Sequence, residues 1–188
     1  GATLLHQGPA GYFRGGLTRE PGYPAVVGLS MLLGDRLGVS YQRVLTTLQL
    51  GVLLLTQLLL FRALLALGVG ARARTLAVLY LGLSPAIVNS ALSLFSEVVT
   101  YPLLLGGLLL LERGRRGLAG SRAATVTTAA AAGATFAALT LCKAVFEAVT
   151  PLLAVLLVVL VWVARGPGTT RRALLFALVT MTVFAAPV

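Results

Sequence analysis

Long apolar runs separated by short, arginine-containing connections make up most of this chain. A helix needs about 20 predominantly apolar residues to cross the roughly 30 Å of hydrocarbon in a bilayer. The pattern predicts six spanning helices of unequal length, with the last one cut short. They comprise residues 44–68, 75–93, 97–111, 123–142, 148–164 and 173–188. We therefore expect an all-α fold, namely a polytopic integral membrane protein with about six transmembrane helices.

The segment before residue 44 differs in composition from the predicted spans. It is rich in glycine at first, and it then carries a short turn-forming stretch at residues 19–24. There Pro-Gly predicts a turn, and each proline is expected to hold its predecessor extended. The apolar run at residues 25–34 is too short to span, which is typical of an interfacial helix. We expect residues 1–43 to form an extracytoplasmic loop with a juxtamembrane helix, and residues 44–188 to form the transmembrane bundle.

Individual residues refine the predicted spans. Pro85 predicts a kink in the second span, and Asn89 places a polar group near its far end. Gly133 follows Ala129 by four residues, a spacing of small residues that lets helices approach closely in lipid. Cys142 is most simply a small packing residue.

Composition excludes several classes of protein. Of 188 residues, 58% are hydrophobic and 11% are charged, and the mean hydropathy is +0.96. Soluble domains are less apolar and carry about 25% charged residues, and disordered chains need low hydrophobicity. One cysteine and one histidine, Cys142 and His6, exclude a disulfide framework and argue against a Cys/His metal cluster. Because the chain starts with glycine and ends inside an apolar run, we expect it to be an excerpt of a longer protein.

The net charge of +10 divides unequally between the two predicted sides of the membrane. One side holds one acid and ten basic residues, a net charge of +9, and the other holds four acids and five basic residues, a net charge of +1. The ten basic residues of the first side are Arg62, Arg72, Arg74, Arg113, Arg115, Arg116, Arg122, Arg165, Arg171 and Arg172. The positive-inside rule assigns the first side to the cytoplasm. The basic excess therefore indicates topology, and we expect membrane lipids as partners and no nucleic acid.

Three ionisable residues on the predicted outer side are candidates for chemistry. Glu97 lies beside a span, where an ionisable group commonly faces an interior cavity. It also fits a helix start, with Ser96 as the cap and Glu97 in the first turn, and the two interpretations are compatible. Lys143 and Glu147 lie four residues apart and share a face if helical. They form either a local surface ion pair or, through Lys143, a cationic site for a lipid phosphate.

The turn-forming stretch is the motif that points to a particular protein family. It reads Arg19-Glu20-Pro21-Gly22-Tyr23-Pro24. With the apolar run after it, this stretch resembles the first outer loop of GT-C class membrane glycosyltransferases. The similar branch contains the protein O-mannosyltransferases and the aminoarabinose transferases, which use lipid-linked sugars. Further pieces follow in the family's order over nearly the whole chain. They are Arg43, the basic turn with Arg72 and Arg74, Ser84-Pro85, Ser96-Glu97 and Leu139-Thr140-Leu141-Cys142-Lys143.

The resemblance implies a GT-C-like core and a polyprenyl-phosphate sugar as donor, with transfer on the extracytoplasmic face of the membrane (the plasma membrane in a bacterium). Arg19 and Lys143 would hold the lipid phosphate, and Glu20 and Glu97 would line the sugar and acceptor pocket. Tyr23 and Glu147 complete the predicted substrate-binding set. The sequence leaves the acceptor unidentified, predicts no certain cofactor, and leaves a divalent cation open.

One departure from the family concerns its catalytic aspartate, which lies early in the first outer loop. Residues 1–19 contain no acid. We expect the catalytic aspartate to lie upstream of Gly1. Glu97 is then expected to be a residue of the pocket and not the general base. The alternative functions are a multi-pass transporter or lipid flippase, and a structural membrane subunit.

Overall fold

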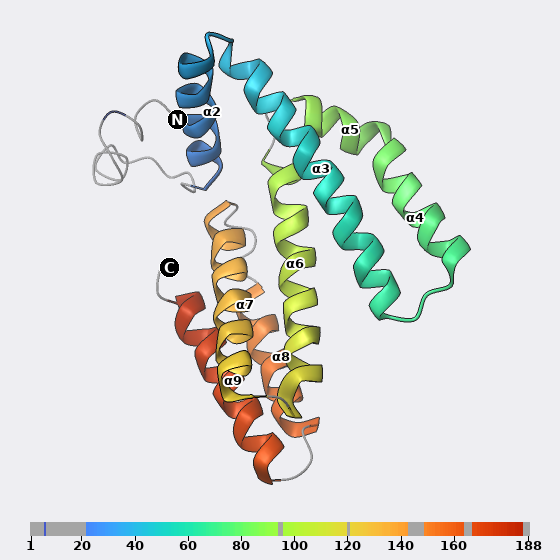
Figure 1. The fold of residues 1–188 in the computed structure, drawn as a ribbon, viewed down its shortest axis with the longest axis vertical. Helices are drawn as coiled ribbons and strands as arrows, with labels where there is room; N and C mark the ends of the chain where they lie inside the picture. The colour runs from blue at the N-terminus through green and yellow to red at the C-terminus, as the bar shows by residue number, and fades with distance from the viewer. Residues whose placement is uncertain are drawn as a thin grey trace. The chain divides into compact units, whose positions relative to one another are not determined.

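The computed structural model describes residue 6 and residues 22–93, 96–119, 121–142, 149–163 and 167–185. The regular secondary structure of these residues is all-helical, and none of them lies in a β-strand, as the apolar pattern predicts (Figure 1). The elements are α2 (Gly22–Leu37), α3 (Tyr41–Ala66), α4 (Ala71–Leu83), α5 (Pro85–Leu92), α6 (Glu97–Arg116), the 3-10 turn η1 (Gly117–Ala119), α7 (Arg122–Cys142), α8 (Val149–Val163) and α9 (Pro167–Ala185).

Within the described ranges, α3 and α7 are each long and apolar enough to cross a membrane. The bent pair α4 and α5 adds a third span if the two helices are taken as one. Six spans are thus not confirmed. The 15 described residues of α8 extend about 22 Å, which is shorter than the hydrocarbon of a bilayer. Both α6 and α9 include charged residues that lower their apolarity.

The surfaces of these helices are consistent with insertion into a membrane. Large apolar side chains are exposed along the candidate spans, among them Leu54 and Leu58 on α3 and Leu76 and Leu79 on α4. Soluble monomers seldom expose apolar surface of this extent. Contact with lipid would remove the free-energy cost of exposing this apolar surface to water.

The chain divides into two compact units, Gly1–Pro102 and Leu103–Val188. In the first unit, α2 and α3 form a helical hairpin whose turn contains Gly38 at a φ of 65°. Only glycine adopts this left-handed conformation readily. The core of the unit comprises Leu53 of α3, Ala91 of α5 and Val98 of α6. The predicted division at residue 43 concerns membrane topology and stays a prediction.

The juxtamembrane helix is longer than the sequence predicts. It begins at Gly22, three residues before the expected start, and it ends at Leu37. Tyr23 is therefore helical, and the expectation that Pro24 holds it extended is wrong. Proline is tolerated in the first turn of a helix, because the N–H that it lacks would have no partner within the helix there.

The second unit is built around the packing of α9 on α7 (Figure 1). Ala129 and Gly133 of α7 are buried, and Thr180 Oγ1 of α9 donates a hydrogen bond of 3.2 Å to the Ala129 carbonyl. A methyl group on Gly133 would collide with the Thr180 carbonyl oxygen. The predicted role of these small residues in close helix packing is confirmed.

Candidate functional site

Tyr23 joins α2 to α3 in the first unit. Its phenol is half-buried, and its oxygen accepts a hydrogen bond of 3.1 Å from Nε2 of Gln49. Gln49 lies on α3 and is 1% exposed. This hydrogen bond fixes the start of α2, directly after residues 19–21, against a candidate spanning helix.

Glu97 is the first residue of α6, where its negative charge favours the positive end of the helix dipole. This confirms its predicted place in the first turn. The residue is half-buried, and its carboxylate oxygen Oε2 is buried. The neighbouring Val98 is fully buried and packs with Leu53 and Ala91. The first turn of α6 is thereby held against α3 and α5, and Glu97 is held with it.

Glu97 and Tyr23 interact electrostatically. The pKa of Tyr23 is raised above its usual 10.0, chiefly because burial disfavours the phenolate. The hydrogen bond from Gln49 lowers this pKa, and the negative charge of Glu97 raises it. The phenol therefore keeps its proton at neutral pH. In the first unit, polar side chains of α2 and α3 are thus in contact, and a carboxylate of α6 acts on the same phenol through its charge. Groups of these three kinds can form hydrogen bonds with hydroxyl groups.

Of the predicted site residues, Tyr23 and Glu97 are described, and the charge of Glu97 acts on the phenol of Tyr23. The others, Arg19, Glu20, Lys143 and Glu147, lie outside the described residues. Their predicted contacts with a lipid phosphate and a sugar stay predictions. His6 is exposed, as expected of a solvated side chain.

Sequence reasoning did not assign Gln49 to the site. Gln49 is a polar residue within the predicted span 44–68. An amide buried in an apolar helix is costly unless it is hydrogen-bonded, so its presence there was the available signal. Its partner Tyr23 could not be found from sequence, because 26 residues separate the two.

The kink predicted at Pro85 is confirmed. α4 ends at Leu83, α5 begins at Pro85, and the axes of the two helices differ by 47°. Ser84 between them has extended backbone angles. On α4, the Arg74 guanidinium lies 5.1 Å from the centre of the Phe61 ring of α3, a cation–π contact that ties the bent pair to α3.

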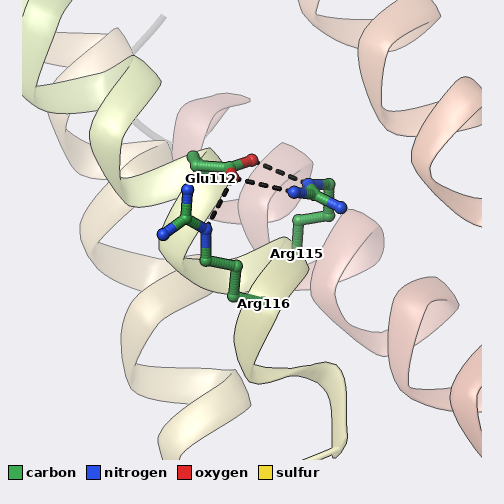
Figure 2. Close-up of polar contacts among 3 residues, drawn as sticks. All are labelled: Glu112, Arg115 and Arg116. Atoms are coloured by element: carbon green, nitrogen blue, oxygen red, sulfur yellow. Dashed lines mark hydrogen bonds and ion pairs between the residues drawn. The ribbon is translucent and has the colours of Figure 1, made fainter. Parts of the chain in front are cut away.

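A second polar cluster lies at the end of α6, in the other unit. Oxygens of Glu112 accept hydrogen bonds of 2.7 and 2.8 Å from Arg115 and of 2.7 Å from Arg116 (Figure 2). Hydrogen bonding from Arg115 is the main cause that lowers the pKa of Glu112 to about 2. The spacings of three and four residues are those of helix-surface ion pairs, so this cluster stabilises a helix end.

Within the described part of the chain, no three His, Cys, Asp or Glu residues form a group that could hold a metal ion. The divalent cation left open by the sequence therefore has no candidate ligand set in that part. No protein-family model, curated protein or solved structure matches this chain.

Proposed function

We propose that this protein is an integral membrane glycosyltransferase that transfers a sugar from a polyprenyl-phosphate donor to an acceptor on the extracytoplasmic face. The observation that carries the proposal is the hydrogen bond between Tyr23 and Gln49 at the start of α2, just after the Arg19-Glu20-Pro21 stretch, with the charge of Glu97 acting on the same phenol. A carboxylate, an amide and a protonated phenol are suited to hydrogen-bonding the hydroxyl groups of a sugar.

The reaction breaks the bond between the anomeric carbon and the phosphate oxygen, and it forms a bond from that carbon to the acceptor. The polyprenyl phosphate departs as an anion, which cationic side chains stabilise. Arg19 and Lys143 are the proposed cations. The acceptor proton passes to a carboxylate base. Glu97 lines the sugar pocket in this scheme.

The proposal is tested by sugar transfer from a labelled donor. Membranes that contain the full-length protein would be given mannosyl or pentosyl polyprenyl phosphate, and label would be followed from the donor lipid into membrane acceptors. We expect transfer above that of membranes lacking the protein, and its loss in Arg19→Ala. Arg36→Ala, an exposed arginine of α2, is the matched control and should retain transfer. If transfer from both donors is no greater than in membranes lacking the protein, the proposal is contradicted.

A transporter or flippase is the second candidate, and the break between α4 and α5 favours it. Broken helices line the substrate sites of many transporters, because their exposed backbone groups can contact a substrate. The structure describes one such pair among its residues, whereas transporters typically have two. Uptake of labelled substrate into vesicles without a covalent transfer product would favour this candidate over the glycosyltransferase.

A further inference from the structure

A cavity of about 570 Å³ lies beside the first turns of α7 and α9 in the second unit. Its described lining has a basic part and an apolar part. Three arginines form one part, and three leucines of α9 form the other. These residues are Arg122, Arg171, Arg172, Leu174, Leu175 and Leu178.

The order of these residues along α9 matches the shape of an amphiphile. Arg171, Leu174, Leu175 and Leu178 follow a spacing of three, four and seven residues, which places them on one face of the helix. The positive charge comes first, and the apolar wall extends over about 10 Å beyond it. Leu174 is 47% exposed and Leu178 is 65% exposed, so an acyl chain would cover apolar surface that the protein leaves open.

One of the three arginines of the cavity is held by a hydrogen bond. Arg172 Nη1 donates a hydrogen bond of 3.1 Å to the carbonyl of the buried Leu118. Arg122 and Arg171 are exposed, and no acid is among the described residues that line the cavity. Glu112, the acid described in this unit, is engaged by Arg115 and Arg116. Arg122 and Arg171 therefore contribute positive charge to a cavity whose described lining contains no acid.

We propose that this cavity binds an anionic phospholipid, with its phosphate on Arg122 and Arg171 and one acyl chain against the leucines of α9. Guanidinium groups bind phosphate oxygens in pairs of parallel hydrogen bonds. The site lies in the arginine-rich connections that the charge count assigns to the cytoplasmic side, where anionic lipids attract basic segments. It is distinct from the described residues of the proposed transferase site, Tyr23, Gln49 and Glu97, which lie in the other unit.

The test is the dissociation constant of phosphatidylglycerol for the full-length protein, measured by native mass spectrometry with phosphatidylcholine as the competing lipid. We expect specific binding of phosphatidylglycerol and a loss of about thirty-fold in affinity for Arg122→Gln/Arg171→Gln. The matched control is Arg62→Gln/Arg113→Gln, which removes two exposed arginines assigned to the same side. This control should bind as the wild type does.

Two results would overturn the proposal. Equal losses in both double variants would mean that the lipid responds to overall charge and not to this cavity. Binding of glycerol phosphate as tight as that of phosphatidylglycerol would mean that the leucine wall contributes nothing. The melting temperature of each variant in phosphatidylcholine alone shows whether it is folded, so a loss of binding can be separated from a loss of structure.

Discussion

Nε2 of Gln49 donates a hydrogen bond of 3.1 Å to the phenol oxygen of Tyr23 and so joins the first turn of α2 to the middle of α3. This contact connects a residue that follows the predicted donor-binding stretch with a buried amide in a candidate spanning helix. The negative charge of Glu97 acts on the same phenol.

Removing the phenol hydroxyl should loosen the attachment of α2. In Tyr23→Phe the Gln49 amide loses its acceptor while it stays buried, which costs about 1 to 3 kcal/mol of stability. We expect a lower melting temperature in detergent, read by differential scanning fluorimetry. Tyr80→Phe is the matched control, because Tyr80 on α4 is 76% exposed, and it should melt with the wild type. An unchanged melting temperature in Tyr23→Phe would show that the hydrogen bond does not hold α2.

Replacing a glycine by alanine should lower the stability of the protein where the glycine lies in the contact between α7 and α9, and should not do so where it faces open space. In Gly133→Ala the new methyl group meets the Thr180 carbonyl and the Val183 side chain, and the helices must separate. Overpacking of this kind costs about 1 to 3 kcal/mol. Gly51→Ala on α3 meets nothing within 4 Å and should be neutral or stabilising, by up to about 1 kcal/mol. Denaturant titration of both variants measures the difference, and equal stabilities would contradict the packing.

The end of α6 should respond to acid. The pKa of Glu112 is lowered from 4.5 to about 2 by its arginine partners, so the folded state favours the carboxylate. Its contribution to stability is complete above about pH 4.5 and is lost as the pH falls toward 2. Because both arginines are more than half exposed, that contribution is about 1 kcal/mol or less.

Comparison of the wild type with Glu112→Gln measures this dependence. The wild type should melt slightly higher above pH 5, and the two curves should meet near pH 2. A constant difference at every pH would mean that the charge of Glu112 is not responsible. Asp35→Asn, an exposed acid of α2, controls for general loss of a carboxylate.

The sequence predicted the existence of the helices better than their ends or their relation to a membrane. Apolar runs indicated where α3, α4, α5 and α7 lie, and Pro85 indicated the break, because these signals are local. The start of α2 was missed, since proline in a first turn behaves differently from proline elsewhere. Two helices, or three with the bent pair, are candidate spans among the described residues, and the other predicted spans are not confirmed, because apolarity alone does not show how far a helix extends before a charge or a turn ends it.

The candidate site was predictable only in part. Glu97 and Tyr23 could be selected as polar residues in unusual places, but their proximity depends on how α2 and α6 pack on α3. Gln49 belongs to the candidate site only because the packing of α2 on α3 brings its amide to the phenol of Tyr23. Helix periodicity predicts which side chains share a face, and it does not predict which face of another helix they meet.

The central claim is that Glu97 lines a sugar-binding pocket of a transferase. Its most direct test is the rate of sugar transfer from labelled polyprenyl-phosphate donor by Glu97→Gln, beside Asp35→Asn as a control of equal charge change. Loss of a charge-assisted hydrogen bond to a sugar hydroxyl should lower the rate roughly ten- to hundred-fold in Glu97→Gln, with Asp35→Asn unchanged. Transfer by Glu97→Gln at the wild-type rate would contradict the account.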